Sequence, residues 1–210
     1  MPVTDRSTSK QTLFQRDQYA KGGVNRVYWD YRDMTVISLL DQNDRLIVDL
    51  GCGEGLTLQK LVRMFSHSEI LGIDLLEENI EVCLKYDLPA RKGDVYKIDL
   101  PKESVDAVLF MEVVEHLDRP VEAISQIHRI LKPGGKLVIV FPNDRFFKLA
   151  RIMTLKIREA FYDPGHLGQW TPRGMKHVLI ETGFEVYYSK FIPFLFWKTS
   201  LHCVIGARKI

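Results

Sequence analysis

The sequence predicts an α/β fold in which a mostly parallel sheet carries helices on both faces. Apolar runs alternate along the chain with segments of helical spacing, as in parallel strands joined by helical crossovers. Two of these runs end in an acid, Asp49 and Asp74. After Asp49 the chain opens at once into alternating glycines at positions 51, 53 and 55, which favours a sharp strand-to-helix turn with room for a small polar ligand.

Length and composition indicate one globular domain. The chain has 210 residues, of which 46% are hydrophobic and 27% charged, enough to bury a sizeable core. A net charge of +2 argues against a dedicated nucleic-acid coat. Three scattered cysteines, a polar start and the lack of an apolar run of ~20 residues predict a cytoplasmic protein, soluble or at most peripheral on a membrane.

The N-terminal part predicts a helix that precedes the sheet. Helical spacing of apolar residues extends over 27–40, after a break at Gly22 and Gly23. Tyr19, Tyr28 and Trp29 lie among charged residues here. Two interpretations stay open, a packing helix at the edge of the core and an aromatic lid that closes over a ligand.

The first two apolar runs predict a βαβ unit. A helix over 56–65 follows the glycine turn, and a second strand over 70–74 ends at Asp74 and leads into a helix through Cys83. Asp74 comes about 20 residues after the glycines, the offset at which an acid at the end of the second strand meets ribose hydroxyls. The two signals together indicate a nucleoside site.

The rest of the chain continues the alternation of strands and helices. Pro120 begins a helix that the run from Lys132 to Gly135 ends, and Thr171 with Pro172 begins another. Further strands are predicted over 88–91, 105–110, 137–141, 184–188 and 201–207.

Two segments each allow two interpretations. A helical pattern with a basic stripe over 145–158 is either a solvated face or a surface for a membrane or an acidic substrate. The apolar connection over 191–197 is either a buried cover or a surface for lipid or an apolar substrate.

Taken together, the motifs resemble class I S-adenosylmethionine-dependent methyltransferases, in particular the methyltransferase type 11 group that includes ubiquinone-biosynthesis enzymes. The matching residues are the Asp-x-Gly-x-Gly-x-Gly turn at 49–55, Asp74, Asp94 and the Leu-Lys-Pro-Gly-Gly-Lys-Leu run at 131–137. The resemblance implies a Rossmann-like, doubly wound seven-stranded sheet, mostly parallel with its last strand antiparallel. We expect one domain over 1–210, with a helical lid over 1–45, a cofactor-binding core over 46–142, and acceptor-side helices with a terminal β-hairpin over 143–210.

The resemblance also implies S-adenosyl-L-methionine as cofactor and S-adenosyl-L-homocysteine as product. By position in the family, the glycine turn lies against the methionine part, Asp74 holds the ribose hydroxyls, and Asp94 with Val95 meets the adenine. The implied cofactor-binding residues are Asp49, Gly51, Cys52, Gly53, Gly55, Asp74, Leu75, Asp94, Val95, Met111 and Glu112.

Methyl transfer asks mainly for in-line placement of an acceptor and for removal of a proton where the acceptor carries one. His166 and His116 are the candidate catalytic bases, because a neutral imidazole accepts a proton near pH 7. No metal is expected. The alternative is a magnesium site on Glu112, Glu115 and His116, which share one face if their segment is helical.

The leading hypothesis is methyl transfer to oxygen, nitrogen or carbon of a small or lipid-like acceptor. A non-catalytic S-adenosylmethionine-binding partner or sensor is one alternative. An NAD(P)-dependent oxidoreductase is another, although its Gly-x-Gly-x-x-Gly fingerprint differs from the strict alternation here. No nucleic-acid partner is expected, a peripheral membrane contact is allowed, and the acceptor and the oligomeric state are left unspecified.

Overall fold

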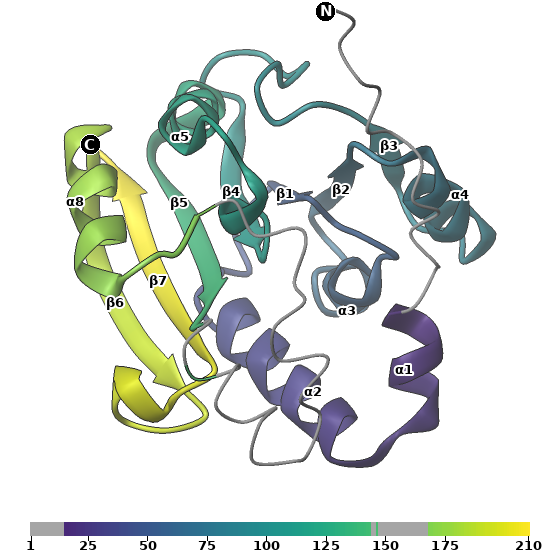
Figure 1. The fold of residues 1–210 in the computed structure, drawn as a ribbon. Coiled ribbons are helices and arrows are strands. Elements are labelled where there is room, and N and C mark those ends of the chain that lie inside the picture. Colours follow the sequence, from purple (N-terminus) through teal and green to yellow (C-terminus); the bar gives the residue numbers. More distant parts are fainter. Residues whose placement is uncertain (1–14, 144–145, 147–167) are drawn as a thin grey trace, which may run out of the picture.

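A seven-stranded sheet forms the centre of the protein (Figure 1). The structure is a computed structural model that describes residues 15–143, 146 and 168–210. The strands lie in the order β3-β2-β1-β4-β5-β7-β6. They are β1 (Leu46–Leu50), β2 (Glu69–Asp74), β3 (Ala90–Lys92), β4 (Val105–Met111), β5 (Leu131–Pro142), β6 (Phe184–Ile192) and β7 (His202–Lys209).

The pairing of the strands confirms the predicted mixed sheet. β1 pairs in parallel with β2 and β4, β2 with β3, and β4 with β5. β7 runs antiparallel to both of its neighbours, β5 and β6. The chain winds outward from β1 to β3 and then returns to β4 on the other side of β1, so the carboxyl ends of β1 and β4 flank the switch point at which open α/β sheets bind ligands.

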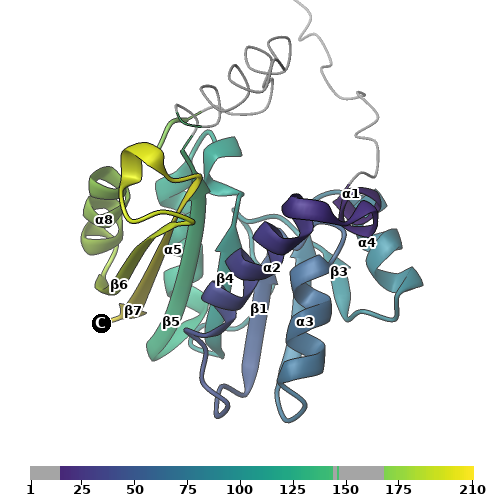
Figure 2. The same ribbon diagram turned by 90° about the horizontal axis from the view of Figure 1, so that it is seen from below.

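Helices cover both faces of the sheet (Figure 2). In the described residues they are α1 (Gln15–Lys21), α2 (Gly23–Ile37), α3 (Leu56–Met64), α4 (Glu77–Lys85), α5 (Pro120–Ile130) and α8 (Pro172–Glu181), with short 3-10 helices η1 (Val114–His116) and η2 (Trp197–Thr199).

Two core clusters fill the space between the sheet and its helices. One lies under α5 and α8 and includes Val48, while the other lies under α2, α3 and α4 and includes Ile47. Both side chains are fully buried. Successive residues of β1 therefore enter opposite layers, which explains why the strand is continuously apolar.

Several helices begin where glycine, proline and N-cap residues predicted that they would. Gly22, between α1 and α2, and Gly23, the first residue of α2, have φ of 72° and 75°. Pro120 occupies the first turn of α5. The Thr171 hydroxyl accepts a hydrogen bond of 3.1 Å from the Gly174 amide at the start of α8.

Other boundaries differ from the prediction. The helix expected over 27–40 begins at Gly23 and ends at Ile37. The fifth strand begins at Leu131 rather than at 137. The register of the β4–β5 pair shifts between Val105 and Ala107, so the residues that follow α5 are included in the strand. β6 extends beyond its predicted end to Ile192, where it pairs with His202, and β7 extends beyond its predicted end to Lys209, where it pairs with Phe184.

Candidate active site

The glycine turn after β1 has a backbone conformation that glycine adopts readily. Gly51, Gly53 and Gly55 have φ of 82°, 53° and 77°, all in the left-handed region. A β-carbon on Gly51 would lie 2.2 Å from Cγ2 of Val113, just beyond the end of β4. The turn is therefore packed directly against the carboxyl end of β4.

Asp49 places a buried carboxyl group beside this turn. Its side chain is 2% exposed, and its Oδ2 atom has no hydrogen-bond partner among the described residues. Burial, followed by the negative charges of Asp33 and Asp74, raises the pKa of Asp49 to about 7, against the opposing charge of Arg32. A buried oxygen of this kind favours a ligand that brings a hydrogen-bond donor or a positive charge.

Asp74 joins the turn to the start of α4. Its Oδ2 accepts a hydrogen bond of 2.8 Å from the Gly53 amide, and its Oδ1 accepts from the Leu76 amide at 2.9 Å and from Nδ2 of Asn79 at 3.0 Å. A carboxylate offers about four lone-pair positions. Three are used here, so Asp74 keeps capacity to accept from a hydroxyl group.

The other residues predicted to bind cofactor lie at the same edge of the sheet. Leu75 follows β2 and is 60% exposed, which leaves an apolar surface next to Asp74. Asp94 follows β3, is exposed, and accepts a hydrogen bond of 2.8 Å from the Tyr96 amide. Cys52 and Met111 are buried at the ends of β1 and β4. The structure thus brings the predicted positions together, and their binding role is a proposal.

Glu112 belongs to a polar cluster that the sequence did not predict. It has a positive φ of 54° directly after β4, and its Oε1 pairs with Nη1 of Arg32 from α2 and, at 2.9 Å, with Nε2 of His202 from β7. The other ring nitrogen of His202, Nδ1, is hydrogen-bonded to the Tyr28 hydroxyl. Although burial opposes it, the charge of Arg32 and the hydrogen bonds from Arg32 and His202 hold the pKa of Glu112 well below its usual range.

Helix α1 packs on the glycine turn. The Glu54 carboxylate accepts hydrogen bonds from the amides of Gln15 at 2.9 Å and Arg16 at 2.7 Å, which caps the helix start. The Arg16 side chain donates in turn to the carbonyl oxygen of Glu54 at 2.7 Å. The N-terminal segment is therefore held against the predicted methionine-binding turn.

Comparison with known proteins identifies the family. A family model described as a methyltransferase domain matches residues 48–139, the stretch that carries the turn, Asp74 and β4. This stretch is a methyltransferase domain of the class I S-adenosylmethionine-dependent type. The match assigns the glycine turn to the methyltransferase type and not to the type found in nicotinamide-dependent oxidoreductases.

Relatives and solved structures agree with the methyltransferase assignment. A ubiquinone biosynthesis O-methyltransferase of Xanthomonas oryzae pv. oryzae is 34% identical over 161 residues, covering 73% of this chain and 62% of the relative. A malonyl-[acyl-carrier protein] O-methyltransferase of Halalkalibacterium halodurans is 30% identical over 161 residues, covering 67% and 58%. The chain spans about three-fifths of the length of these curated relatives.

The fold is shared with solved methyltransferases. The crystal structure of a SAM-dependent methyltransferase from Archaeoglobus fulgidus superimposes with a TM-score of 0.72 at 22% sequence identity, covering 94% of this chain and 100% of that one. The Rossmann-like fold predicted from the sequence is therefore confirmed.

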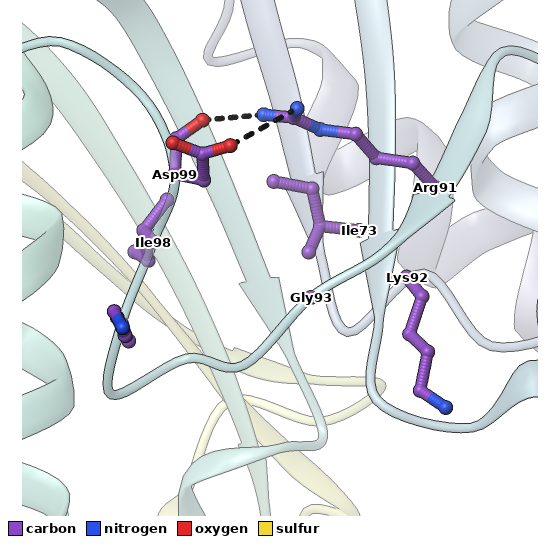
Figure 3. Close-up of a pocket in the computed structure, with 7 residues that line it drawn as sticks. Ile73, Arg91, Lys92, Gly93, Ile98 and Asp99 are labelled. Carbon is purple, nitrogen blue, oxygen red and sulfur yellow. Dashed lines mark hydrogen bonds and ion pairs between the residues drawn. The ribbon is translucent and has the colours of Figure 1, made fainter.

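A small cavity lies next to the carboxyl ends of β2 and β3. It measures about 60 Å³ and is lined in part by Ile73, Gly93 and Ile98, with Arg91 and Asp99 in contact across it (Figure 3). Ligand pockets commonly measure about 300–1,000 Å³. The cavity is too small for a nucleoside and includes none of the acids of the glycine turn.

The magnesium alternative assumed a helix that the structure does not form at Glu112. Glu112 has a left-handed φ and is not helical, and only residues 114–116 form a 3-10 helix. Glu115 is buried whereas His116 is exposed, so the expected common face does not form. In the described part of the chain no three His, Cys, Asp or Glu side chains are placed to hold a metal ion.

The two histidines predicted as bases have different outcomes. His116 lies exposed in η1, and its catalytic role stays a prediction. His166 lies outside the described residues, as does the basic stripe over 145–158 apart from residue 146. Of the predicted aromatic lid, Tyr19 stacks on Trp29 at 6.3 Å between ring centroids, whereas Tyr28 contacts His202.

Sequence reasoning missed Arg32 and His202. Arg32 is one of several charges on a partly polar helix. His202 carried a usable signal, because it is a lone imidazole directly before the apolar run 203–207. In the structure it is only 4% exposed. Buried polar groups of this type are hydrogen-bonded and frequently functional.

Proposed function

We propose that this protein transfers a methyl group from S-adenosylmethionine to a hydroxyl group of a small, amphipathic acceptor. The observation that carries the proposal is the buried Asp49, whose Oδ2 atom has no partner in the described part of the chain and which lies beside a turn of three left-handed glycines at the switch point of a methyltransferase fold. A buried acid fits a cationic ligand, and the cofactor is a cation.

The residues at this edge of the sheet fit the cofactor. The glycine turn and Asp49 would hold its methionine part, Asp74 has lone-pair capacity for ribose hydroxyls, and exposed Leu75 offers an apolar face to a base. When bound, S-adenosylmethionine supplies an activated methyl group whose transfer leaves the electron pair of the broken bond on sulfur. The protein's task is then to orient the acceptor and exclude water.

Two observations support an amphipathic hydroxyl acceptor. The relatives described above are O-methyltransferases, one named for ubiquinone biosynthesis. The connection between β6 and β7 exposes Phe194, Leu195 and Phe196 by 53%, 85% and 72%. We call these three residues the apolar tip, and we propose that it makes the peripheral membrane contact that a lipid-like acceptor favours.

The location and organisation of the protein follow as further proposals. All three cysteines are buried and free, which suits a reducing cytoplasm. We propose that the chain forms one domain with three parts: a lid over 1–45, a cofactor-binding core over 46–142 and an acceptor side over 143–210. Among the helices that the structure describes, none is long and apolar enough to cross a bilayer.

Calorimetry and a transfer assay test the function. We expect S-adenosylhomocysteine to bind and NADH not to bind, and labelled methyl to reach one member of a panel of phenols, quinols, sugars and lipids. NADH binding without S-adenosylhomocysteine binding would refute the proposal. Tight S-adenosylhomocysteine binding with no transfer to any acceptor, including nitrogen and carbon acceptors, would favour a binding partner or sensor instead.

A further inference from the structure

Four side chains form a continuous polar chain beside the proposed cofactor site. Tyr28 and Arg32 come from α2, Glu112 from the end of β4 and His202 from the start of β7. Glu112 binds both Arg32 and His202, and His202 binds Tyr28. Val113, the neighbour of Glu112, packs on Gly51, so this cluster directly adjoins the glycine turn.

The partners of His202 determine which ring nitrogen carries its proton. Arg32 keeps Glu112 ionised, and an ionised carboxylate only accepts hydrogen bonds. Nε2 of His202, 2.9 Å from Glu112 Oε1, must therefore be the protonated nitrogen. Nδ1 is then an acceptor, and the Tyr28 hydroxyl donates to it.

We propose that Tyr28 is the catalytic residue that meets the acceptor hydroxyl, and that His202 and Glu112 are positioning residues that receive its proton. This inference rests on the proposed function. The order of the two proton transfers follows from side-chain exposure. His202 is 4% exposed, whereas Tyr28 is only half-buried, so Tyr28 is the residue that a bound acceptor can contact.

The proton moves in two linked transfers. The acceptor hydroxyl donates its proton to Oη of Tyr28 while Tyr28 passes its own proton to Nδ1 of His202, so the phenol is neutral before and after. The acceptor oxygen keeps the electron pair of its O–H bond and uses it for the new bond to the methyl carbon. The proton ends on His202, whose positive charge lies against Glu112.

Titratable side chains from two parts of the fold contact His202. Glu112 faces it from just beyond the end of β4, and Tyr28 faces it from α2. Arg32 acts through Glu112, and Tyr31 acts through Tyr28. The ionised Glu112 thus fixes the ring orientation and stabilises the imidazolium that forms.

Nitrogen NMR tests the tautomer without any acceptor. The full chain, labelled with ¹⁵N-histidine and saturated with S-adenosylhomocysteine or free of it, should show His202 with a proton on Nε2 and none on Nδ1 near pH 7.5. His202→Asn assigns the signals by their loss. A proton on Nδ1, alone or together with one on Nε2, overturns the relay.

Kinetics with the acceptor found in the screen test the catalytic role. Tyr28→Phe and His202→Asn should each lower kcat about 100-fold with unchanged S-adenosylhomocysteine affinity. Tyr187→Phe and His177→Asn, which alter partly exposed residues of β6 and α8, should match the wild type. The losses should shrink at least tenfold with a fluorinated analogue of the acceptor, whose more acidic hydroxyl needs no base.

The outcomes separate this relay from the proposed function. Equal losses with the ordinary and the fluorinated acceptor would show a merely structural role for Tyr28 and His202 and overturn the relay. Failure of the wild type to bind S-adenosylhomocysteine would refute the methyltransferase function, and the NMR result then decides the tautomer by itself.

Discussion

Asp49 combines a stability cost with a proposed binding function. Burial and the charges of Asp33 and Asp74 disfavour its carboxylate and raise its pKa to about 7, compared with ~3.9 for an exposed aspartate. A positively charged ligand nearby offsets part of this cost. The residue therefore weakens the free protein at neutral pH and favours binding of a cation at the same place.

The pH dependence of stability tests this account. Because the folded pKa of Asp49 lies above its unfolded value, its contribution is full below pH ~4 and is lost as the pH rises through about 7. We expect the free energy of unfolding of Asp49→Asn, relative to wild type, to increase by up to ~4 kcal/mol between pH 4 and pH 8 in urea titrations.

Asp106→Asn provides a control of opposite sign. Although burial opposes it, hydrogen bonds from Lys132 and the Leu46 amide lower the pKa of Asp106. That residue stabilises the fold above its unfolded pKa and loses its contribution as the pH falls. A stability difference between Asp49→Asn and wild type that stays constant with pH would contradict the raised pKa.

A comparison of Gly51 with Gly134 separates the cost of a steric contact from the cost of backbone strain. Gly51→Ala should destabilise the fold by about 2–4 kcal/mol and abolish S-adenosylhomocysteine binding, because φ is 82° and the new β-carbon would meet Val113. Gly134 has a similar φ of 75° but nothing within 4 Å of a β-carbon. Gly134→Ala should cost only about 1 kcal/mol and leave binding intact. Equal costs in denaturant titrations would rule out the contact with Val113.

At the scale of an element, the connection after β6 presents the apolar tip in a fixed conformation. Trp197 packs edge-on against Phe141 at 5.8 Å between centroids. The carbonyl oxygens of Phe194, Phe196 and Trp197 accept hydrogen bonds from Ser200 Oγ, the Thr199 amide and Asn143 Nδ2. Backbone groups that are already bonded enter an apolar phase at low cost, so the tip suits shallow insertion between lipids.

Vesicle sedimentation tests the membrane contact. The full chain should bind vesicles of phosphatidylcholine with phosphatidylglycerol, and the triple change Phe194→Ser, Leu195→Ser and Phe196→Ser should weaken binding at least tenfold. Lys190 and Lys198 flank the tip, and each change to Gln should weaken binding to the anionic vesicles about fivefold.

Changes elsewhere on the surface serve as the vesicle control. Val121→Ser with Ile180→Ser alters two apolar side chains that are 50% and 62% exposed on α5 and α8, and should leave vesicle binding unchanged. A lack of binding by the wild type would contradict the membrane contact. A tip-dependent dimer in size-exclusion chromatography without vesicle binding would instead make the tip a protein interface.

At the scale of the whole molecule, the site joins segments that are distant in sequence. Helix α1 packs on the glycine turn, and α2 contacts β7 through the Tyr28–His202 pair, which spans 174 positions of the chain. A ligand bound at this edge contacts several parts of the fold at once. Binding should therefore stabilise the molecule as one unit.

Thermal unfolding measures this coupling. S-adenosylhomocysteine at 100 times its Kd should stabilise the protein by about 2.7 kcal/mol and raise Tm by roughly 5–10 °C, in a single transition. NADH at the same concentration should leave Tm unchanged. A second transition that does not respond to S-adenosylhomocysteine would show that part of the chain folds independently of the site.

The sequence predicted those features that depend on local patterns. Asp49, the glycines and Asp74 follow from strand ends and a turn whose backbone requires glycine, so their neighbourhood was foreseeable. The partners of Glu112 could not be predicted, because Arg32 and His202 reach it through tertiary contacts that leave no periodic pattern in the sequence. The helix assumed for the alternative metal site was wrong for a related reason, since Glu112 has a positive φ and lies outside the 3-10 helix that follows it.

The position of β7 in the sheet has a consequence for how the protein is made. β7 follows β6 in the chain but lies between β5 and β6, and β6 has β7 as its strand partner. A ribosome therefore delivers β6 before the strand that attaches it to the sheet, and His202 emerges together with that strand. A nascent chain arrested before Leu201 would possess the glycine turn, yet it would lack the proton acceptor that we assign to catalysis.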